Sequence, residues 1–573
     1  MDQHATLKNR RTYRQQAFTR LFIFFGIIVL VNVLSSAFIF RIDLTSDNRF
    51  TLTDSTKKLL LNLDDVVFVK VYLEGDFPSG FKRLSNSSRE MLDEFKVYGG
   101  DKIQYEFEDP TEGKTEKELN DVLKELSEKG LEPTNVQNQA GDEYSEKIIV
   151  PGAILNYKGQ SVPINLLENT PGTGPQMALN NSIAHLENKF SVAIHQISMI
   201  RKPKIGFILG QGEMNNLQMA DFMKLLSGFY ELIPVELESE IQIKNDIRVV
   251  VIAKPTKPFS EENKFKLDQY IMNGGKTLWL VEALHAELDS VVLRPSFLTV
   301  DYPLNLEDQL FRYGIRINPD LMLDLQCNPV PLLVSYEGQK PSFKLFPCYY
   351  FPIFTAKSEH PIVKNIDAVA SQFASTIDTL ALKGVKKTIL LSSSSNSRIV
   401  FTPWLIDFRE LKNRPRPEDY KKTDLISAVL LEGEFPSVFT NRVSPEMQKT
   451  LNDSLHMPFR EQSADTKMIV ISDGDIAKNE INAQRQPSAL GYYRFTGEFF
   501  GNSNFLLNCI DYLTGFEEHI DTRSKTMKLR MLDAAKVKQE KSKWQLINMI
   551  APLVALAVFG LIFNFVRYRK YAK

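Results

Sequence analysis

The pattern of hydrophobic positions gives the chain two long apolar ends and a mixed middle. Residues 21–40 and residues 547–566 are runs of twenty residues without a charged side chain. As helices rising about 1.5 Å per residue, both runs are long enough to cross a hydrocarbon layer about 30 Å thick. No comparable run lies between them. The pattern therefore predicts two membrane-spanning helices with an aqueous body between them.

Basic residues flank the outer end of each apolar run, and they predict its orientation. Positive flanks stay in the cytoplasm, so we expect residues 1–20 and residues 567–573 to be cytoplasmic tails. The alternative for residues 21–40 is a cleaved signal peptide, but the run is long for one and lacks a small-residue cleavage pattern near Phe38. The basic residues are Lys8, Arg10, Arg11, Arg14, Arg20, Arg567, Arg569, Lys570 and Lys573.

Strand and helix patterns alternate through residues 41–200, which predicts a first α/β domain. Thr53 or Asp54 is expected to cap a helix that carries Leu59 and Leu63. The other expected strands are 66–73, 103–107 and 147–157, and the other expected helices are 85–97, 115–127 and 178–198.

A second α/β domain is expected over residues 201–521, with a charged helical stalk over 522–546 leading to the second span. Its strands are short and apolar, as in a doubly wound, mostly parallel sheet. The pattern over residues 284–354 is irregular and rich in proline, which predicts a large insertion over one edge at about residues 284–387. The expected strands are 205–209, 233–237, 248–253, 277–281, 388–391, 399–401 and 467–472, and the expected helices are 217–229, 261–272 and 499–513.

Composition argues against two classes of protein, nucleic-acid-binding proteins and small disulfide-rich domains. The chain has 69 basic and 70 acidic residues and no long basic run with interleaved aromatics, so nucleic acid is not an expected partner. Three cysteines, none closely spaced, do not form a disulfide framework of the kind found in small secreted domains. Cys327 and Cys348 are left with two alternatives, pairing in an oxidising compartment or remaining buried thiols.

A Gly-Gly-Lys-Thr sequence at 274–277 resembles the end of a phosphate-binding P-loop. That loop runs from a strand into a helix, whereas here a helix precedes the glycines and a strand follows them. Tyr270 also stands where the motif needs a further glycine. We expect a helix end leading into a core strand.

A turn made of Gly210, Gln211, Gly212 and Glu213 follows an expected strand and precedes an expected helix. Glycines at this place allow a ligand to approach the start of a helix. However, Asn215 replaces the third glycine of a dinucleotide-binding turn, and Glu213 would repel phosphate. The turn is therefore a weak ligand-binding candidate, and a purely structural turn is the favoured interpretation.

Asp473 and Asp475 follow the expected strand 467–472, at the end where such sheets bind ligands. Two nearby carboxylates could hold a hard cation or share a proton, or form a solvated turn. No third oxygen ligand is visible at a supporting spacing, so no metal or cofactor is predicted. No HExxH, Cys/His metal spacing or Gly-x-Ser-x-Gly elbow occurs, and nothing in the sequence requires an enzyme.

Five segments taken in order resemble the GldG family, gliding-motility ABC-transporter auxiliary proteins of Bacteroidetes. The resemblance covers nearly the whole chain and implies a periplasmic body, an inner-membrane location, and partnership with an ABC permease and a cytoplasmic ATPase. It also implies a second domain similar to flavodoxin-like and class I glutamine-amidotransferase sheets. Gln211 stands where the family turn has His, and no cysteine occupies the amidotransferase nucleophile position. The segments are 43–53, 71–75, 210–213, 268–276 and 501–508.

The leading functional hypothesis is a non-enzymatic, membrane-anchored accessory subunit of an ABC-type complex linked to gliding motility. One alternative is a membrane-anchored envelope hydrolase or amidotransferase-like enzyme, which requires Glu213, Asp473 and Asp475 to converge in one pocket. The other alternative is a tethered solute receptor, which requires a deep cleft between the two α/β domains. The sequence does not identify a ligand, a stoichiometry or a direction of transport.

Overall fold

A computed structural model describes residues 18–30, 51–140, 143–168, 174–199, 201–288, 296–337, 340–453, 458–482, 484–524 and 534–571. The chain divides into two units, residues 1–52 and residues 53–573. In the first unit an apolar helix, Phe18–Leu30, has exposed side chains. The remainder of the first predicted span, residues 31–40, lies outside the described residues.

The second predicted span lies in α14 (Ala534–Tyr571), a 38-residue helix with Pro552 in its interior. Within it, residues Glu540–Arg569 are long and apolar enough to cross a membrane, and none of the apolar window is buried. The predicted stalk falls on the end of α13 (Glu517–Ser524) and the start of α14. Residues 525–533, between these helices, lie outside the described part of the chain.

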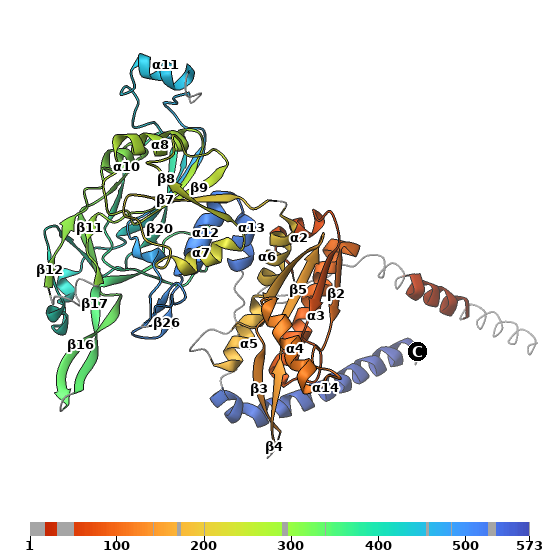
Figure 1. The fold of residues 1–573 in the computed structure, drawn as a ribbon. Helices are drawn as coiled ribbons and strands as arrows, with labels where there is room; N and C mark the ends of the chain where they lie inside the picture. The colour runs from red at the N-terminus through yellow and green to blue at the C-terminus, as the bar shows by residue number, and fades with distance from the viewer. Residues whose placement is uncertain are drawn as a thin grey trace, which may run out of the picture. The chain divides into compact units, whose positions relative to one another are not determined.

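The N-terminal part of the second unit contains a four-stranded sheet in the order β2-β1-β5-β6, of which Figure 1 labels β2 and β5. Strand β1 is parallel to β2 and antiparallel to β5. The elements are α2 (Asp54–Leu61), β1 (Val67–Val71), α3 (Ser79–Gly99), β2 (Ile103–Phe107), α4 (Glu116–Glu128), β3 (Thr134–Ala140), β4 (Glu143–Ile149), β5 (Gly152–Tyr157), β6 (Gln160–Asn165), α5 (Pro175–Ala184) and α6 (Leu186–Ser198).

The predicted alternation is confirmed here, with two corrections. Thr53 caps α2, accepting a hydrogen bond from the Thr56 backbone N–H. The expected strand 147–157 is two strands, because Pro151 lacks a backbone N–H and separates β4 from β5. The expected helix 178–198 is also divided, with α5 ending and α6 beginning at His185.

The C-terminal part of the second unit contains a ten-stranded sheet in the order β16-β17-β20-β23-β24-β10-β9-β7-β8, with β18 beside β17. Strands β24, β10, β9, β7 and β8 are parallel, and the pairs from β16 to β24 are antiparallel. The sheet is therefore mixed, and the expectation of a mostly parallel sheet is wrong for the strands from β16 to β23. Residues of the expected insertion at 284–387 supply β16, β17, β18 and part of β20, so they extend the sheet itself.

The parallel half comprises β7 (Lys204–Leu209), α7 (Ala220–Ser227), β8 (Glu231–Glu236), β9 (Ile247–Ala253), α8 (Glu261–Met272), β10 (Lys276–Leu280) and β24 (Thr466–Ile471). The antiparallel half comprises β16 (Cys327–Glu337), β17 (Lys340–Ala356), β18 (Val369–Ala370), β20 (Val385–Ser392) and β23 (Ile426–Gly433). The other helices are α10 (Glu307–Tyr313), α11 (Pro445–Asp453) and α12 (Asn502–Thr514). Short two-stranded pairs involve β11 (Leu284–His285), β12 (Ser296–Leu298), β13 (Val300–Asp301), β14 (Ile315–Ile317), β15 (Asp320–Asp324), β19 (Ile377–Thr379), β21 (Ser397–Phe401), β22 (Leu405–Asp407), β25 (Tyr492–Tyr493) and β26 (Glu498–Phe499).

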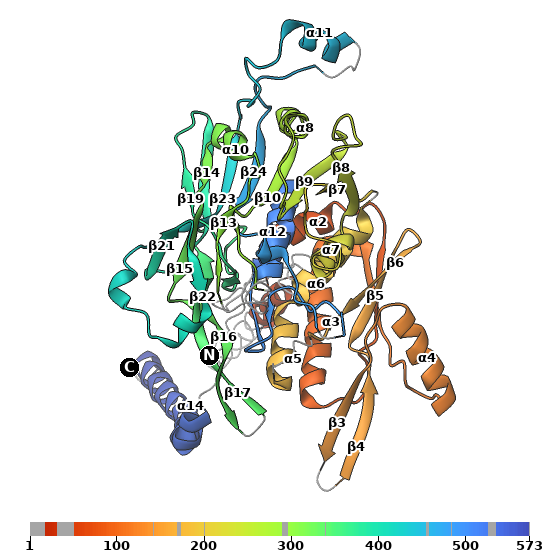
Figure 2. The ribbon, with the colours of Figure 1, turned by 60° about the vertical axis from the view of Figure 1, so that its left-hand side comes forward.

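Helices cover both faces of the parallel half, and each face has its own core. Successive residues of a strand point to opposite faces, so Val249 and Val251 of β9 join the core beneath α7 and α12. Val250 and Ile252 join the core beneath α8 and α10. Figure 2 shows α12 alongside these strands. A strand buried on both faces reads as a continuous apolar run, which is why β9 was predictable.

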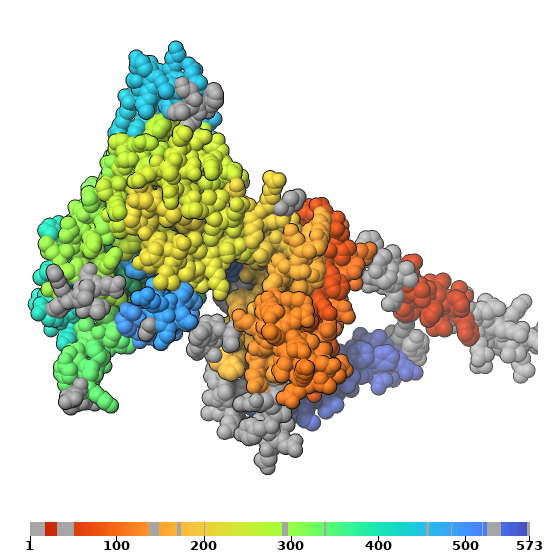
Figure 3. Space-filling model, viewed as in Figure 1, coloured from red at the N-terminus to blue at the C-terminus, as the bar shows by residue number. Residues whose placement is uncertain are grey.

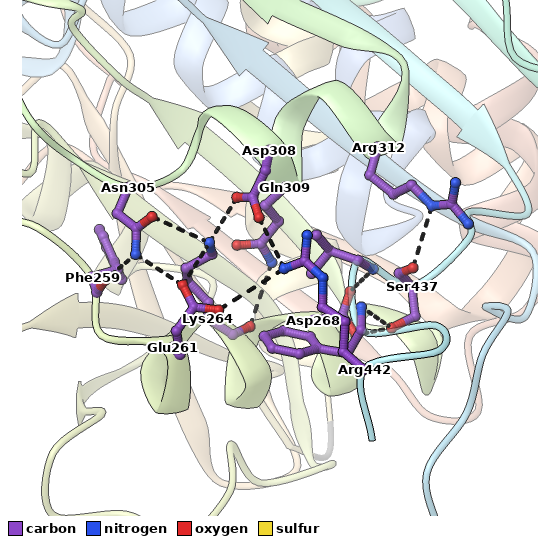
Figure 4. A network of polar contacts seen from close by, with 12 residues as sticks. Phe259, Glu261, Lys264, Asp268, Asn305, Asp308, Gln309, Arg312, Ser437 and Arg442 are labelled. Carbon is purple, nitrogen blue, oxygen red and sulfur yellow. Dashed lines mark hydrogen bonds and ion pairs between the residues drawn. The ribbon is translucent and has the colours of Figure 1, made fainter. Parts of the chain in front are cut away.

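A polar network fixes α8 to its neighbours, and Figure 4 labels four of its residues, Lys264, Asp268, Asp308 and Ser437. Together with Tyr313, which bonds to Asp268, we call these residues the α8 network. Lys264 Nζ lies 2.7 Å from Asp308 Oδ1 and 3.1 Å from Glu261 Oε1. The Asp268 carboxylate accepts hydrogen bonds from Tyr313 Oη at 2.9 Å, Ser437 Oγ at 2.6 Å and the Val438 backbone N–H at 3.1 Å. The network satisfies charges on a helix that is buried along most of its length.

Two segments extend from the body of this domain, the β16–β17 hairpin and the arm that carries α11 (Figure 3). The hairpin exposes apolar side chains on both strands: Val334, Tyr336, Phe343 and Leu345. Its strands also carry Cys327 and Cys348, which are free thiols in the structure. Burial raises the pKa of Cys327 to about 12.

A histidine pair joins α6 to α13. His195 Nδ1 and His519 Nε2 lie 2.9 Å apart, so one ring donates a hydrogen bond to the other. His519 Nδ1 is 3.6 Å from Asp511 Oδ1, and Arg523 forms an ion pair with the other oxygen of Asp511 at 2.8 Å. Burial, followed by the charge of His519, lowers the pKa of His195 to about 4.

Candidate functional site

The turn at residues 210–213 follows β7 and is held against the segment after β9. Gly210 and Gly212 have positive φ angles of 116° and 76°, which glycine adopts readily. A Cβ at Gly212 would also collide with Thr256. The Gln211 carbonyl accepts hydrogen bonds from the backbone N–H groups of Thr256 and Lys257, at 2.9 and 2.8 Å. Local backbone geometry therefore accounts for both glycines.

A pocket of about 720 Å³ opens beside this turn, lined in part by Gly210, Gly212, Glu213 and Lys257. Glu213 Oε2 accepts a hydrogen bond from the Gln211 N–H at 2.8 Å. Its Oε1, like Gln211 Oε1, is buried without a hydrogen-bond partner among the described residues. Burial raises the pKa of Glu213. The helix expected from residue 217 begins only at Ala220, so the turn does not lead directly into it.

Three strand ends meet at the same edge of the sheet and form what we call the strand-end cluster: Lys254, Glu282, Asp473 and Asp475. Lys254 directly follows β9, Glu282 comes two residues after β10, and the two aspartates follow β24. These strands are parallel neighbours, so their carboxyl ends lie side by side. Lys254 Nζ is 2.8 Å from Asp475 Oδ1 and 3.0 Å from Glu282 Oε1.

The backbone around the cluster is shaped to receive the lysine. Lys254 has a φ of 53°, an uncommon value for a residue with a side chain. A Cβ at Gly474 would lie 2.5 Å from Lys254 Cβ, so the residue between the two aspartates has to be small. Asp473 accepts hydrogen bonds from the backbone N–H groups of Gln372, at 2.9 Å, and Asp475, at 2.7 Å.

The carboxylates of the cluster are perturbed in opposite directions. Burial raises the pKa of Glu282 well above its ordinary value. Burial, followed by the charge of Asp475, raises the pKa of Asp473 to about 7. Burial also raises the pKa of Asp475, but the ammonium groups of Lys254 and Lys478 outweigh it, and the net pKa is lowered. At Lys254 burial lowers the pKa, but the carboxylates of Asp475 and Glu282 outweigh it, and the net pKa is raised well above its ordinary value.

The structure thus places the six candidate residues in two groups at one edge of the sheet. Gly210, Gly212 and Glu213 line the pocket, and Gln211 is buried beside it. Asp473 and Asp475 lie in the cluster, where Glu282 is the third carboxylate. The pocket lining includes neither aspartate, so the geometry offers no support for the hydrolase alternative, which needs all three carboxylates in one pocket.

Lys254 and Glu282 were not identified from the sequence. A signal for them exists, because each is a charged residue at the end of a continuous apolar run, as Asp473 is. In a parallel sheet such residues converge when their strands are neighbours. The strand order was the missing information, since Lys254 and Asp475 are separated by 221 positions.

Comparison with known protein families gives two matches that together cover most of the chain. Residues 202–509 match the model of a family described as an ABC-type uncharacterized transport system, ABC_transp_aux. Residues 46–156 match a domain of unknown function, DUF7088. Residues 157–201 lie between the two matches.

An uncharacterized protein of Borreliella burgdorferi (strain ATCC 35210) is 21% identical over 559 residues, covering 96% of each chain. Among solved structures, the mmIFT52 N-terminal domain is similar with a TM-score of 0.30 and 13% identity, over 57% of this chain and 100% of that one. The exo-β-1,4-mannosidase Op5Man5 from Opitutaceae bacterium strain TAV5 has a TM-score of 0.19 and 10% identity, over 52% of this chain and 35% of that one.

Proposed function

This chain belongs to the family of ABC-type transport-system auxiliary proteins, and from that premise we propose that it is a membrane-anchored accessory subunit of an ABC transporter. The family match is the observation that carries the proposal, and it favours a non-enzymatic role. The partners are an ABC permease and a cytoplasmic ATPase that supplies the energy. The chain contributes its two α/β domains as a binding or coupling surface.

We propose the periplasm as the location of both α/β domains and the inner membrane as their anchor. The apolar segment Glu540–Arg569 of α14 supports one span, and the uncharged run at 21–40 supports the other. The basic residues in both tails support a cytoplasmic location for both ends of the chain. This topology puts the body on the opposite face of the membrane from the ATPase, so coupling between them has to pass through the permease or the two spans.

Accessibility of an introduced cysteine tests this topology. Lys344 is an exposed residue of β17, whereas Cys348 and Cys509 are buried. In intact spheroplasts we expect a membrane-impermeant maleimide to label Lys344→Cys and to spare a cysteine introduced at residue 573. The wild-type chain gives the background from Cys327. Labelling of residue 573 and protection of residue 344 would place the body in the cytoplasm and refute the proposal.

Co-purification tests the accessory role itself. The full chain, tagged at its C-terminus and extracted from its own host in a mild detergent, is expected to bring down a permease and an ATPase. A matched control replaces residues 547–566 with twenty leucines, which keeps the anchor and removes specific helix contacts. Loss of partners only in the control would assign docking to the span. Absence of both partners from the wild-type pulldown would overturn the proposal.

The link to gliding motility is the finer part of the proposal, and it rests on the resemblance to the GldG family. We expect a gliding host that lacks this chain to stop moving, and the full chain to restore movement. Normal gliding in the deletion strain, together with intact co-purification, would retain the transporter role and remove the link to motility.

A further inference from the structure

The strand-end cluster contains three carboxylates and one ammonium group, and all four side chains are buried. Its three carboxylates bring three negative charges when ionised, and Lys254 supplies one positive charge from within. Lys478 stands at the rim, 30% exposed, with its Nζ 3.5 Å from Asp475 Oδ1. Buried charges persist when they are paired or bound to a cation. When all three carboxylates are ionised, the cluster is therefore short of positive charge, which agrees with the raised pKa values of Glu282 and Asp473.

Among the described residues, neither oxygen of Glu282 has a hydrogen-bond partner, and only Oε1 has an ion-pair partner. Glu282 is 3% exposed, and its Oε1 faces the Lys254 ammonium at 3.0 Å. Its Oε2 is buried without a hydrogen-bond partner or an ion pair in the described part of the chain. Glu282 offers a carboxylate oxygen that lies within 4.8 Å of one on Asp473 and one on Asp475. The side chain thus extends from the end of β10 toward the aspartates after β24.

We propose that Glu282, Asp473 and Asp475 bind one hard divalent cation, Mg²⁺, Mn²⁺ or Ca²⁺, next to Lys254. A cation with oxygen bonds of about 2.0–2.6 Å spans ligand oxygens up to about 5 Å apart, which covers the spacing seen here. Carboxylate ligands without sulfur or imidazole suit hard cations such as Mg²⁺, Mn²⁺ and Ca²⁺. The two positive charges of the ion compensate the charge that Lys254 leaves unpaired.

Lys254 occupies only one side of the cluster. Its ammonium contacts Glu282 Oε1 and Asp475 Oδ1. The Asp473 oxygens instead accept backbone N–H groups, and each keeps a further lone pair for a cation. The unpartnered Glu282 Oε2 and the Asp473 carboxylate thus provide ligands that the lysine does not use. A bound ion would tie the end of β10 to the end of β24.

The test uses the full chain, purified in detergent and stripped with a chelator. Titration with MgCl₂, MnCl₂ and CaCl₂ by calorimetry is expected to show one site per chain for at least one of these ions. Glu282→Gln and Asp475→Asn are expected to lower its affinity tenfold or more. Asp246→Asn, an exposed acid paired with Lys204, is the matched control and should bind as the wild type does. Thermal unfolding verifies that each variant is folded.

Lys254→Met separates the proposal from the simpler alternative that the lysine is the only cation of the cluster. If the lysine alone completes the cluster, the wild type binds no ion and the Lys254→Met variant does, which would overturn the proposal. Saturable binding by the wild type that Glu282→Gln does not weaken would overturn it as well. If Glu282→Gln fails to fold, weakened binding in Asp475→Asn decides the same question. The result does not depend on which transporter the chain serves.

Discussion

The α8 network and the strand-end cluster each place a buried lysine between two carboxylates, but with different access to water. Lys264 is 1% exposed, yet its partners Glu261 and Asp308 are 61% and 39% exposed. Lys254 is 4% exposed, and its partners Glu282 and Asp475 are as deeply buried as the lysine. Water thus solvates one side of the first arrangement and neither side of the second. Similar distances therefore correspond to different electrostatic energies.

The contrast shows why a list of ion pairs does not rank their importance. A carboxylate that keeps its hydration loses little when its partner is removed, and such exposed pairs contribute about 0–1 kcal/mol. A carboxylate that has given up its hydration depends on the partner, and removing one member of a buried pair costs about 3–5 kcal/mol. The two lysines provide a direct test of this difference.

Lys254→Met is expected to have the largest effect, a loss of about 3–5 kcal/mol in the free energy of unfolding, because the buried carboxylates of Glu282 and Asp475 lose the ammonium group that they contact. Lys264→Met, the matched substitution, is expected to cost about 1 kcal/mol, since its partners reach solvent. Urea unfolding of the full chain in detergent, followed by tryptophan fluorescence, measures both. Equal losses would contradict the comparison.

The histidine pair between α6 and α13 is an intermediate case, with partly buried rings beside Asp511 and Arg523. The pKa of His195 is lowered to about 4 in the folded chain and is about 6.5 when unfolded. Below about pH 6.5 His195 binds a proton in the unfolded chain, whereas in the folded chain it binds one only below about pH 4. Stability is therefore lost as the pH falls through this window, by at most about 3 kcal/mol.

Unfolding midpoints measured from pH 7 to pH 4 check this expectation. His195→Phe keeps an aromatic ring against Phe516 and removes the titrating group, so its stability should decline less steeply than that of the wild type. His285→Phe, at an exposed position, controls for the loss of a histidine. Identical pH slopes for the wild type and His195→Phe would show that this pair does not sense pH.

The smallest difference is expected between two acid-to-amide substitutions. Asp268→Asn is expected to cost about 2 kcal/mol, because the new amide group faces donors from Tyr313, Ser437 and Val438. Glu282→Gln is expected to cost less than about 1 kcal/mol in chelator, because it removes one unbalanced negative charge and leaves an oxygen for Lys254. Unfolding free energies measure both, and a larger loss for Glu282→Gln would reverse the ranking.

The parallel half of the sheet was predictable from the sequence, and the antiparallel half was not. Strands β9, β10 and β24 are continuous apolar runs because both of their faces are buried. Strands β16 and β17 contain prolines, which argue against strands wherever the backbone N–H is needed. The sheet tolerates them because β16 is an edge strand, and β17 pairs with β18 and β20 only at residues 353–356, beyond its prolines. Proline was therefore interpreted as irregular structure where a hairpin exists.

Only half of the strand-end cluster could be predicted from the sequence, for a related reason. Asp473 and Asp475 are close in sequence, so their proximity needs no fold. Lys254 and Glu282 join them only because β9, β10 and β24 are neighbours, and neighbour order is a tertiary property. The glycine turn was visible as a motif, but Thr256, which forbids a side chain at Gly212, belongs to a distant loop.

The central position of β24 has a consequence for biogenesis. It separates β23 from β10 in the middle of the sheet, yet it is the last long strand in the chain. The ribosome has to synthesise residue 471 before β24 can pair with both β23 and β10. Until then the edges of β23 and β10 expose unpaired backbone groups to any neighbouring polypeptide. Premature termination before β24 thus leaves two incomplete half-sheets, a natural target for proteolytic quality control.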